Sequence, residues 1–195
     1  MPGDTKANLP VLLFENQPAW EAWIQLHYAD SDGIWLKMAK KGSGIATISY
    51  NEALEIALCF GWIDSQIAAY DQQFYLHKFS PRRSKSKWSK MNREMAETLI
   101  ATGRMHPPGL QQVELAKADG RWEAAYDPQS QITIPPDLQL ALDKNQQAKD
   151  FFAALNSINR YAILHRIQTA KKPETRASRI QKFVEMLAKR QKIYP

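Results

Sequence analysis

The chain has 195 residues, of which 44% are hydrophobic and 24% are charged, so it contains enough apolar material for one sizeable core. Its single cysteine, Cys59, excludes an intramolecular disulfide and a thiolate metal cluster, and it indicates a reducing compartment. No segment approaches the ~18 consecutive apolar residues of a membrane span, and residues 1–10 lack the apolar run of a signal peptide. We therefore expect a cytoplasmic protein without an integral membrane segment.

The basic residues behind the formal net charge of +6 gather in two segments. Residues 76–104 contain eight Lys or Arg and two Glu, and residues 160–195 contain ten Lys or Arg and two Glu. If both segments lie on one face, that face attracts phosphate-rich or otherwise anionic partners. The alternative is that these side chains are solvent-exposed residues of ordinary helices and bind no partner.

The first half of the chain alternates between helical and strand patterns. Apolar spacing after Pro18 predicts a short helix whose aromatic pair, Trp20 and Trp23, enters the core, and residues 34–38 are typical of a strand. Ser49 and Glu52 have the spacing of a capping box, so a central helix starts there and ends near Gly61. Residues 63–70 and 73–79 then predict an antiparallel hairpin.

The second half is helical by pattern. A helix is predicted from Ser86 to about Gly103, and another follows Pro107, before a loop that contains Trp122. Beyond Pro136, apolar stripes mark further helices, with Pro173 between the last two. The fold class is therefore α+β: a small antiparallel sheet, made of an N-terminal strand plus a hairpin, packed by helices, with a largely helical C-terminal half. We expect a single domain over 1–195, and the alternative division is an α+β part over 1–104 and a helical part over 105–195.

Three runs, spread along the chain, carry a resemblance to a known family. They are ALCFGWIDS at 57–65, FSPRRSKSKWS at 79–89 and ETRASRI at 174–180. Shorter pieces such as DGRW at 119–122 stand between them in the expected order. Together they resemble the bacteriocin-protection, YdeI/OmpD-associated (OmdA) family over nearly the whole chain. The resemblance implies a role in bacteriocin protection, or in envelope or stress tolerance, and it transfers no catalytic residues.

The segment from Pro81 to Lys90 has the strongest chemical signal, because five cationic side chains alternate with three serines and one tryptophan. Arginine forks and serine hydroxyls donate to phosphate oxygens, and an indole can stack on a base or a sugar. The alternative is a serine helix cap, an inward tryptophan and solvated cations. The candidate ligands of an anion are Arg82, Arg83, Lys85, Ser86, Lys87 and Trp88, with Arg104, Arg176 and Arg179 from other segments.

A second group, Trp62, Asp64 and Ser65, lies at a predicted helix-to-strand junction, and we expect it to support the site. Asp64 is predicted to orient Arg82 or Arg83 in an ion pair, and general acid–base chemistry is the alternative. The nucleophile pattern G-x-S-x-G is absent, and no histidine has the sequence context of a base.

Cofactor motifs are absent from the sequence. The histidines and the cysteine lack the spacing of metal ligands, and the glycines at 42 and 44 do not form a nucleotide-binding pattern. We therefore expect no metal and no cofactor. The preferred interpretation is a non-catalytic protein that binds an anionic small molecule or a nucleic acid. The alternatives are a small hydrolase or transferase that uses Asp64 or Ser65 near the basic groove, and a protein-interaction module with an unknown partner.

Overall fold

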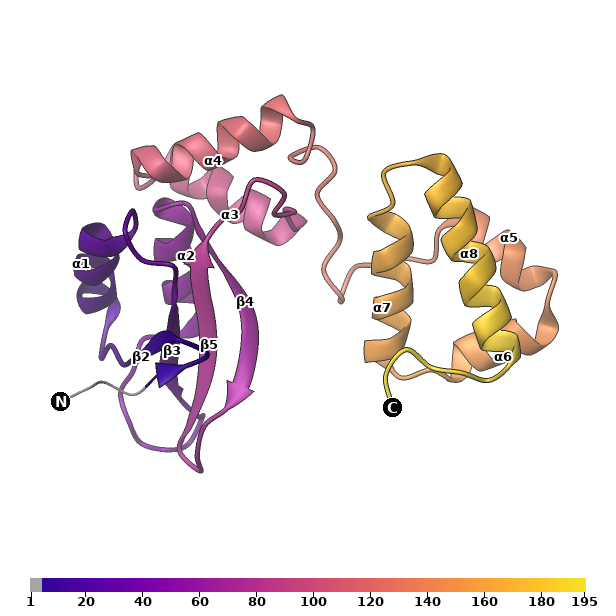
Figure 1. The fold of residues 1–195 in the computed structure, drawn as a ribbon, viewed down its shortest axis with the longest axis horizontal. Helices are drawn as coiled ribbons and strands as arrows, with labels where there is room; N and C mark the ends of the chain where they lie inside the picture. The colour runs from indigo at the N-terminus through magenta and orange to yellow at the C-terminus, as the bar shows by residue number, and fades with distance from the viewer. Residues whose placement is uncertain (1–4) are drawn as a thin grey trace. The chain divides into compact units, whose positions relative to one another are not determined.

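The computed structural model describes residues 5–195, which pack as two compact units (Figure 1). Unit 1 contains residues 5–87 and 92–123, and unit 2 contains residues 88–91 and 124–195. Unit 1 holds the β-sheet with helices, and unit 2 is built from helices (Figure 1). The predicted α+β class with a helical C-terminal half is therefore confirmed.

The sheet of unit 1 has five strands in the order β1-β2-β3-β5-β4. The strands are β1 (Thr5–Lys6), β2 (Leu9–Leu12), β3 (Ile34–Ala39), β4 (Trp62–Ala69) and β5 (Phe74–Pro81). The predicted strand and hairpin are confirmed as β3 and as the antiparallel pair β4 and β5. The sheet is mixed rather than purely antiparallel, because β2, which was not predicted, runs parallel to β3.

Two helices pack against each other beside the sheet, and the second of them contacts β4. They are α1 (Gln17–His27) and α2 (Tyr50–Cys59). Trp20 of α1 is fully buried and packs against the rings of Trp62 and Phe79. At the start of α2, the Ser49 hydroxyl accepts from the Glu52 N–H, and the Glu52 carboxylate accepts from the Ser49 N–H, so the predicted capping box is confirmed.

Two further helices follow the sheet: α3 (Lys90–Ala101) and α4 (Pro107–Ala118). The predicted start of α3 near Ser86 is wrong by about one turn. The Ser86 hydroxyl accepts from the Arg83 N–H, so it closes a tight turn instead of capping a helix. Gly61, between α2 and β4, has φ +74°, and a Cβ there would lie 2.8 Å from the carbonyl oxygen of Pro108, so the α2–α4 packing requires glycine.

Unit 2 contains α5 (Pro136–Asp143), α6 (Gln146–Ala154), α7 (Ser157–Gln168) and α8 (Pro173–Ala188). Helix α8 contacts the other three, and the apolar stripes predicted from the sequence meet in one core. The members of that core with no exposed surface are Leu138, Ala148, Ile163, Ile167 and Leu187. None of the helices formed by residues 5–195 has the length and apolar character needed to span a bilayer.

Candidate functional site

The loop between β5 and α3, residues 82–87, is named here the basic loop. Its centre is a turn in which the Ser86 N–H donates to the Arg83 carbonyl across 2.9 Å, and the Arg83 N–H donates to the Ser86 hydroxyl across 3.0 Å. Ser86 is therefore occupied in shaping the loop. The loop leaves the end of β5 at Arg82, whose N–H donates to the Gly61 carbonyl.

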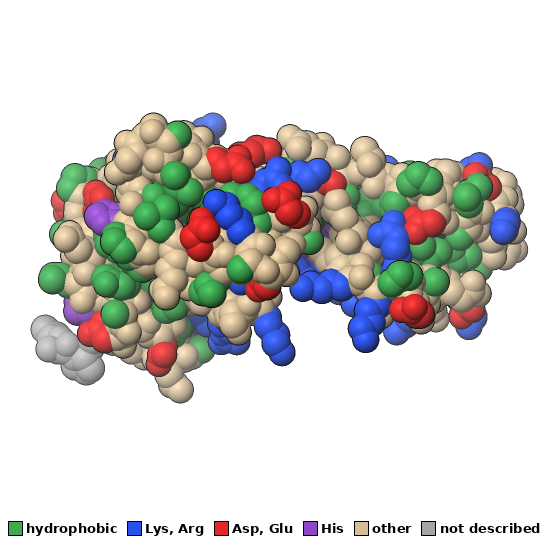
Figure 2. Space-filling model, turned by 90° about the horizontal axis from the view of Figure 1, so that it is seen from above, with side chains coloured by type: hydrophobic (Ala, Val, Ile, Leu, Met, Phe, Trp, Pro, Cys, Tyr) green, Lys and Arg blue, Asp and Glu red, His purple; other side chains and the backbone are tan. Residues whose placement is uncertain are grey.

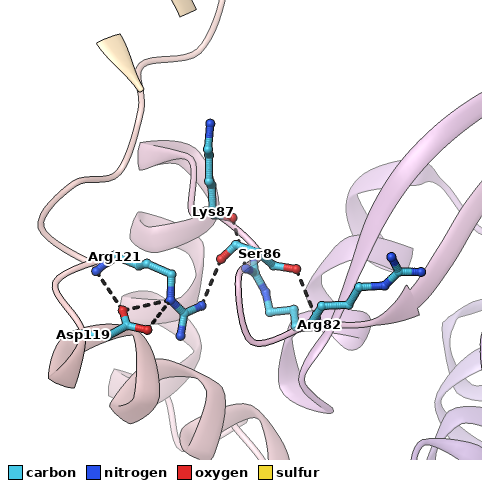
Figure 3. A network of polar contacts seen from close by, with 6 residues as sticks. Arg82, Ser86, Lys87, Asp119 and Arg121 are labelled. Atoms are coloured by element: carbon cyan, nitrogen blue, oxygen red, sulfur yellow. Dashed lines mark hydrogen bonds and ion pairs between the residues drawn. The ribbon is translucent and has the colours of Figure 1, made fainter. Parts of the chain in front are cut away.

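Two buried arginines hold the backbone of the basic loop (Figure 3). Arg82 is 7% exposed, and its Nη1 donates to the Lys87 carbonyl across 3.3 Å. Arg121 is also 7% exposed, and its Nη1 donates to the Ser86 carbonyl across 2.9 Å. The Nε of Arg121 donates to both carboxylate oxygens of Asp119, across 2.6 and 2.8 Å. The charge of this buried guanidinium is thereby balanced, and the guanidinium acts as a clamp on the loop.

The remaining cations of the basic loop, Arg83, Lys85 and Lys87, are exposed. No Asp or Glu carboxylate within residues 5–195 lies at ion-pair distance from Arg83 or Lys85. The Lys87 side chain points away from the clamp (Figure 3). On the face of the molecule in Figure 2, some Lys and Arg side chains (blue) lie beside Asp or Glu side chains (red), and others have no acidic neighbour.

Trp62 and Trp88 both lie inside the fold. Trp88 is 2% exposed, so its indole is packed instead of presented for stacking. Trp62 is 1% exposed and donates from its indole nitrogen to the Tyr28 carbonyl across 3.1 Å. Neither side chain contributes an accessible ring to the basic loop.

Asp64 has different partners from those predicted. Its Oδ2 accepts from the Tyr50 hydroxyl across 3.1 Å and lies 3.3 Å from Nε2 of His77. The Tyr50 and His77 rings stack with centroids 4.8 Å apart. Asp64 therefore joins α2, β4 and β5, and the predicted ion pair with Arg82 or Arg83 is wrong. Ser65 is exposed at an irregularity in β4 and is not brought into this group.

A cavity of about 570 Å³ borders Tyr50. It is lined by residues 38–45 and 47–50 together with Tyr75, and it does not include Asp64 or His77. Lys40 in its wall donates to the Asp71 carbonyl across 2.7 Å. Tyr50 therefore connects the Asp64–His77 pair to a space large enough for a small molecule.

Arg104 lies outside the basic loop, between α3 and α4. Its Nη1 donates to the Glu55 carboxylate of α2 across 2.8 Å. Because this ion pair is partly exposed, it neutralises the charge of Arg104 only in part. The guanidinium can therefore still attract an anionic ligand.

Arg176 and Arg179 of unit 2 have well-defined structural partners. Arg176 donates from Nη1 to the Ile167 carbonyl across 3.0 Å, and Arg179 donates from Nη1 to the Arg166 carbonyl. Both acceptors belong to the last turn of α7, where helix carbonyls lack intrahelical partners and cations are favoured. Arg176 also forms a two-pronged ion pair with Asp137. The arginines of the ETRASRI run thus join α8 to the end of α7.

Sequence reasoning missed Arg121 and Asp119 as parts of the site. Their two-residue spacing within DGRW was the available signal, but only the fold reveals that Arg121 reaches Ser86. Within residues 5–195, no group of three His, Cys, Asp or Glu side chains is placed to hold a metal ion.

Two family models match the chain. Residues 12–112 match a domain of unknown function (DUF8412), and residues 131–190 match the family described as bacteriocin-protection, YdeI or OmpD-associated. The runs at 57–65 and 79–89 fall in the first match, and the run at 174–180 falls in the second. The curated proteins and the solved structures contain no match. The first match covers more than half of the chain, so the chain belongs to the DUF8412 family. The match over residues 131–190 supports the resemblance to the bacteriocin-protection, YdeI or OmpD-associated family that was predicted from the sequence.

Proposed function

We propose that unit 1 binds a phosphate-bearing ligand through the exposed cations of the basic loop. The observation that supports this most strongly is the contrast within the loop. Two buried guanidiniums hold its carbonyls, whereas Arg83, Lys85 and Lys87 are exposed. A loop fixed before binding loses less conformational freedom on binding, so more of the electrostatic attraction appears as affinity.

The residue types favour phosphate over other anions. The Arg83 guanidinium can donate two parallel hydrogen bonds to phosphate oxygens, and the two lysines add point charges. The Ser84 hydroxyl, also exposed, is a further donor. Three cations on one short loop can neutralise several phosphates of a nucleic acid, or one diphosphate of a sugar.

The biological setting we propose follows from the C-terminal match. Its description speaks of bacteriocin protection and of association with OmpD. A cytoplasmic protein that binds nucleic acid or a phosphorylated envelope precursor is compatible with a role in envelope or stress tolerance. The whole protein is then a binding protein, with no reaction required of it.

The direct test is a triple variant, Arg83→Gln, Lys85→Gln and Lys87→Gln, titrated with single-stranded DNA, double-stranded DNA and a nucleotide sugar. We expect the binding to be lost while the fold remains, because all three side chains are exposed. Lys182→Gln, Lys189→Gln and Lys192→Gln, three exposed lysines near the end of unit 2, form a control with the same change in net charge. Equal loss of binding in both variants would show non-specific charge attraction and would contradict the proposal.

A second candidate function is a small hydrolase or transferase, and one observation favours it. The carboxylate of Asp64 lies within contact distance of both His77 and Tyr50, and Tyr50 borders the 570 Å³ cavity. A tyrosine hydroxyl held by a carboxylate can accept or deliver a proton. Under this alternative, Tyr50→Phe abolishes turnover of a phosphoester or acyl substrate without unfolding the protein, whereas the triple variant leaves turnover measurable.

A further inference from the structure

A cavity of about 310 Å³ lies within unit 2, beside the first two turns of α7. Ser157, Arg160, Tyr161 and Leu164 line it, and their spacing places them on one face of that helix. Ile132 and Leu155 complete an apolar part of the wall. The volume falls at the lower end of the range for ligand pockets, so it suits a molecule of a few carbon atoms with one polar group.

Arg160 is the charged residue of this wall, and its charge is not balanced by a carboxylate. No Asp or Glu of residues 5–195 lies within ion-pair distance of its guanidinium. Its Nη2 donates to the Ala153 carbonyl across 2.7 Å, and its guanidinium lies 5.7 Å from the Phe152 ring centroid. Its Nε is buried and has no hydrogen-bond partner. A partly buried guanidinium in this condition is stabilised by any anion that supplies the missing acceptor.

Asp127, whose backbone contacts a neighbour of Arg160, does not supply this carboxylate. The Tyr161 hydroxyl donates weakly to the backbone carbonyl of Asp127 across 3.5 Å. The carboxylate of Asp127 instead accepts from Lys90 across 2.5 Å and from the Gln168 amide. The positive charge of Arg160 is thus left for a molecule that enters the cavity.

We infer that this cavity binds a small organic carboxylate, with the carboxylate on Arg160 and the Ser157 or Tyr161 hydroxyl, and the apolar body against Ile132, Leu155 and Leu164. Two parallel N–H···O bonds between a guanidinium and a carboxylate are the paired geometry that arginine favours. The apolar wall selects against inorganic anions and acetate, because they bury little apolar surface. This site is separate from the basic loop in residues and in ligand class.

The test is a titration of the full chain, observed by amide chemical shifts, with acetate, butyrate, hexanoate and the neutral hexanamide. We expect affinity to rise from acetate to hexanoate, hexanamide to bind much more weakly, and the shifts to centre on residues 129–164. Arg160→Gln should weaken hexanoate binding about tenfold or more, since it removes a charged hydrogen-bond partner. Arg166→Gln, the same change further along α7, should leave binding unchanged.

A second variant keeps the test decisive if Arg160→Gln unfolds unit 2. Ser157→Tyr places a ring in the cavity, retains Arg160 and should also abolish hexanoate binding. The triple variant of the basic loop should bind hexanoate normally, so failure here and failure of the proposed phosphate site are distinguishable. Equal affinity for hexanoate and hexanamide, shifts spread over the whole surface, or unchanged binding by Ser157→Tyr would each overturn the inference.

Discussion

Nη1 of Arg121 donates a hydrogen bond to the carbonyl oxygen of Ser86, 35 residues earlier in the chain, across 2.9 Å. This bond ties the basic loop to the segment that follows α4. The same guanidinium is held by Asp119, so its orientation is fixed from the other side. The conformation of the exposed cations therefore depends on a buried cation that itself cannot touch a ligand.

Replacing this clamp should affect stability and binding together. Arg121→Met keeps much of the side-chain volume but leaves the Ser86 carbonyl without its donor, so we expect a loss of about 1–3 kcal/mol in the free energy of unfolding. Anion affinity should also fall, although no exposed cation has been removed. Urea denaturation and a nucleic-acid titration measure the two effects.

The matched control for Arg121 is Lys117→Met, which removes a cation from an exposed ion pair with Glu114. Exposed pairs contribute less than about 1 kcal/mol, so this variant should unfold close to the wild-type urea concentration. If Arg121→Met behaves like Lys117→Met in both measurements, the clamp does not determine the loop conformation.

The Tyr50–Asp64–His77 cluster gives a second prediction. Asp64→Asn should lower the free energy of unfolding by about 1–3 kcal/mol, because the amide replaces a charged acceptor with a neutral group. Tyr50→Phe should lower it by less, and the double variant should lose less than the sum of the two single losses, since both remove the same hydrogen bond. Strict additivity in a double-mutant cycle would show that the 3.1 Å contact contributes no coupling energy.

Local patterns in the sequence were enough to predict much of unit 1. The Ser49–Glu52 capping box and the end of the helix near Gly61 are properties of a few neighbouring residues, and both are confirmed. Strand β2 was missed because it has only four residues, one of them Pro10, and because its pairing with β3 is long-range. Short strands defined by a distant partner carry little signal of their own.

The site was harder to predict than the fold, because it depends on which of two adjacent side chains is buried and which is exposed. Arg82 and Arg83 are adjacent and chemically identical, yet Arg82 is buried and Arg83 is exposed. The partners of Asp64 depend on the register of β4 against β5 and on the position of α2. The arginines of the ETRASRI run suggested a ligand site, but their partners are the carbonyls at the end of α7.

Unit 2 should lose stability in acid partly through Asp127. A hydrogen bond from Lys90 is the largest cause that holds the pKa of Asp127 below its ordinary value, and Gln168 adds to it while burial opposes it. This contribution is fully present above the unfolded pKa of about 3.9, and it is lost as the pH falls through the lowered folded value. Asp127→Asn should therefore flatten the acid limb of a plot of melting temperature against pH below about pH 4. An acid limb that is the same in the variant and in the wild type would contradict this prediction.

The thiol of Cys59 should react slowly with labelling reagents in the folded protein. It is buried, and desolvation raises the pKa of its thiol to about 11, so very little thiolate exists at pH 8. We expect labelling by an aromatic disulfide reagent to be limited by unfolding and to become fast in 6 M guanidinium chloride. Rapid labelling of the folded protein at pH 8 would mean that the end of α2 opens readily.

The most direct test of the central claim is the salt dependence of DNA binding by the wild-type chain and by the Arg83→Gln, Lys85→Gln, Lys87→Gln variant. If the basic loop contacts phosphates, the wild type binds with a steep loss of affinity in salt, and the variant reduces the slope of log K against log salt by about 2 to 3. If the two proteins bind with the same slope and affinity, the exposed cations of the basic loop are not the ligand site.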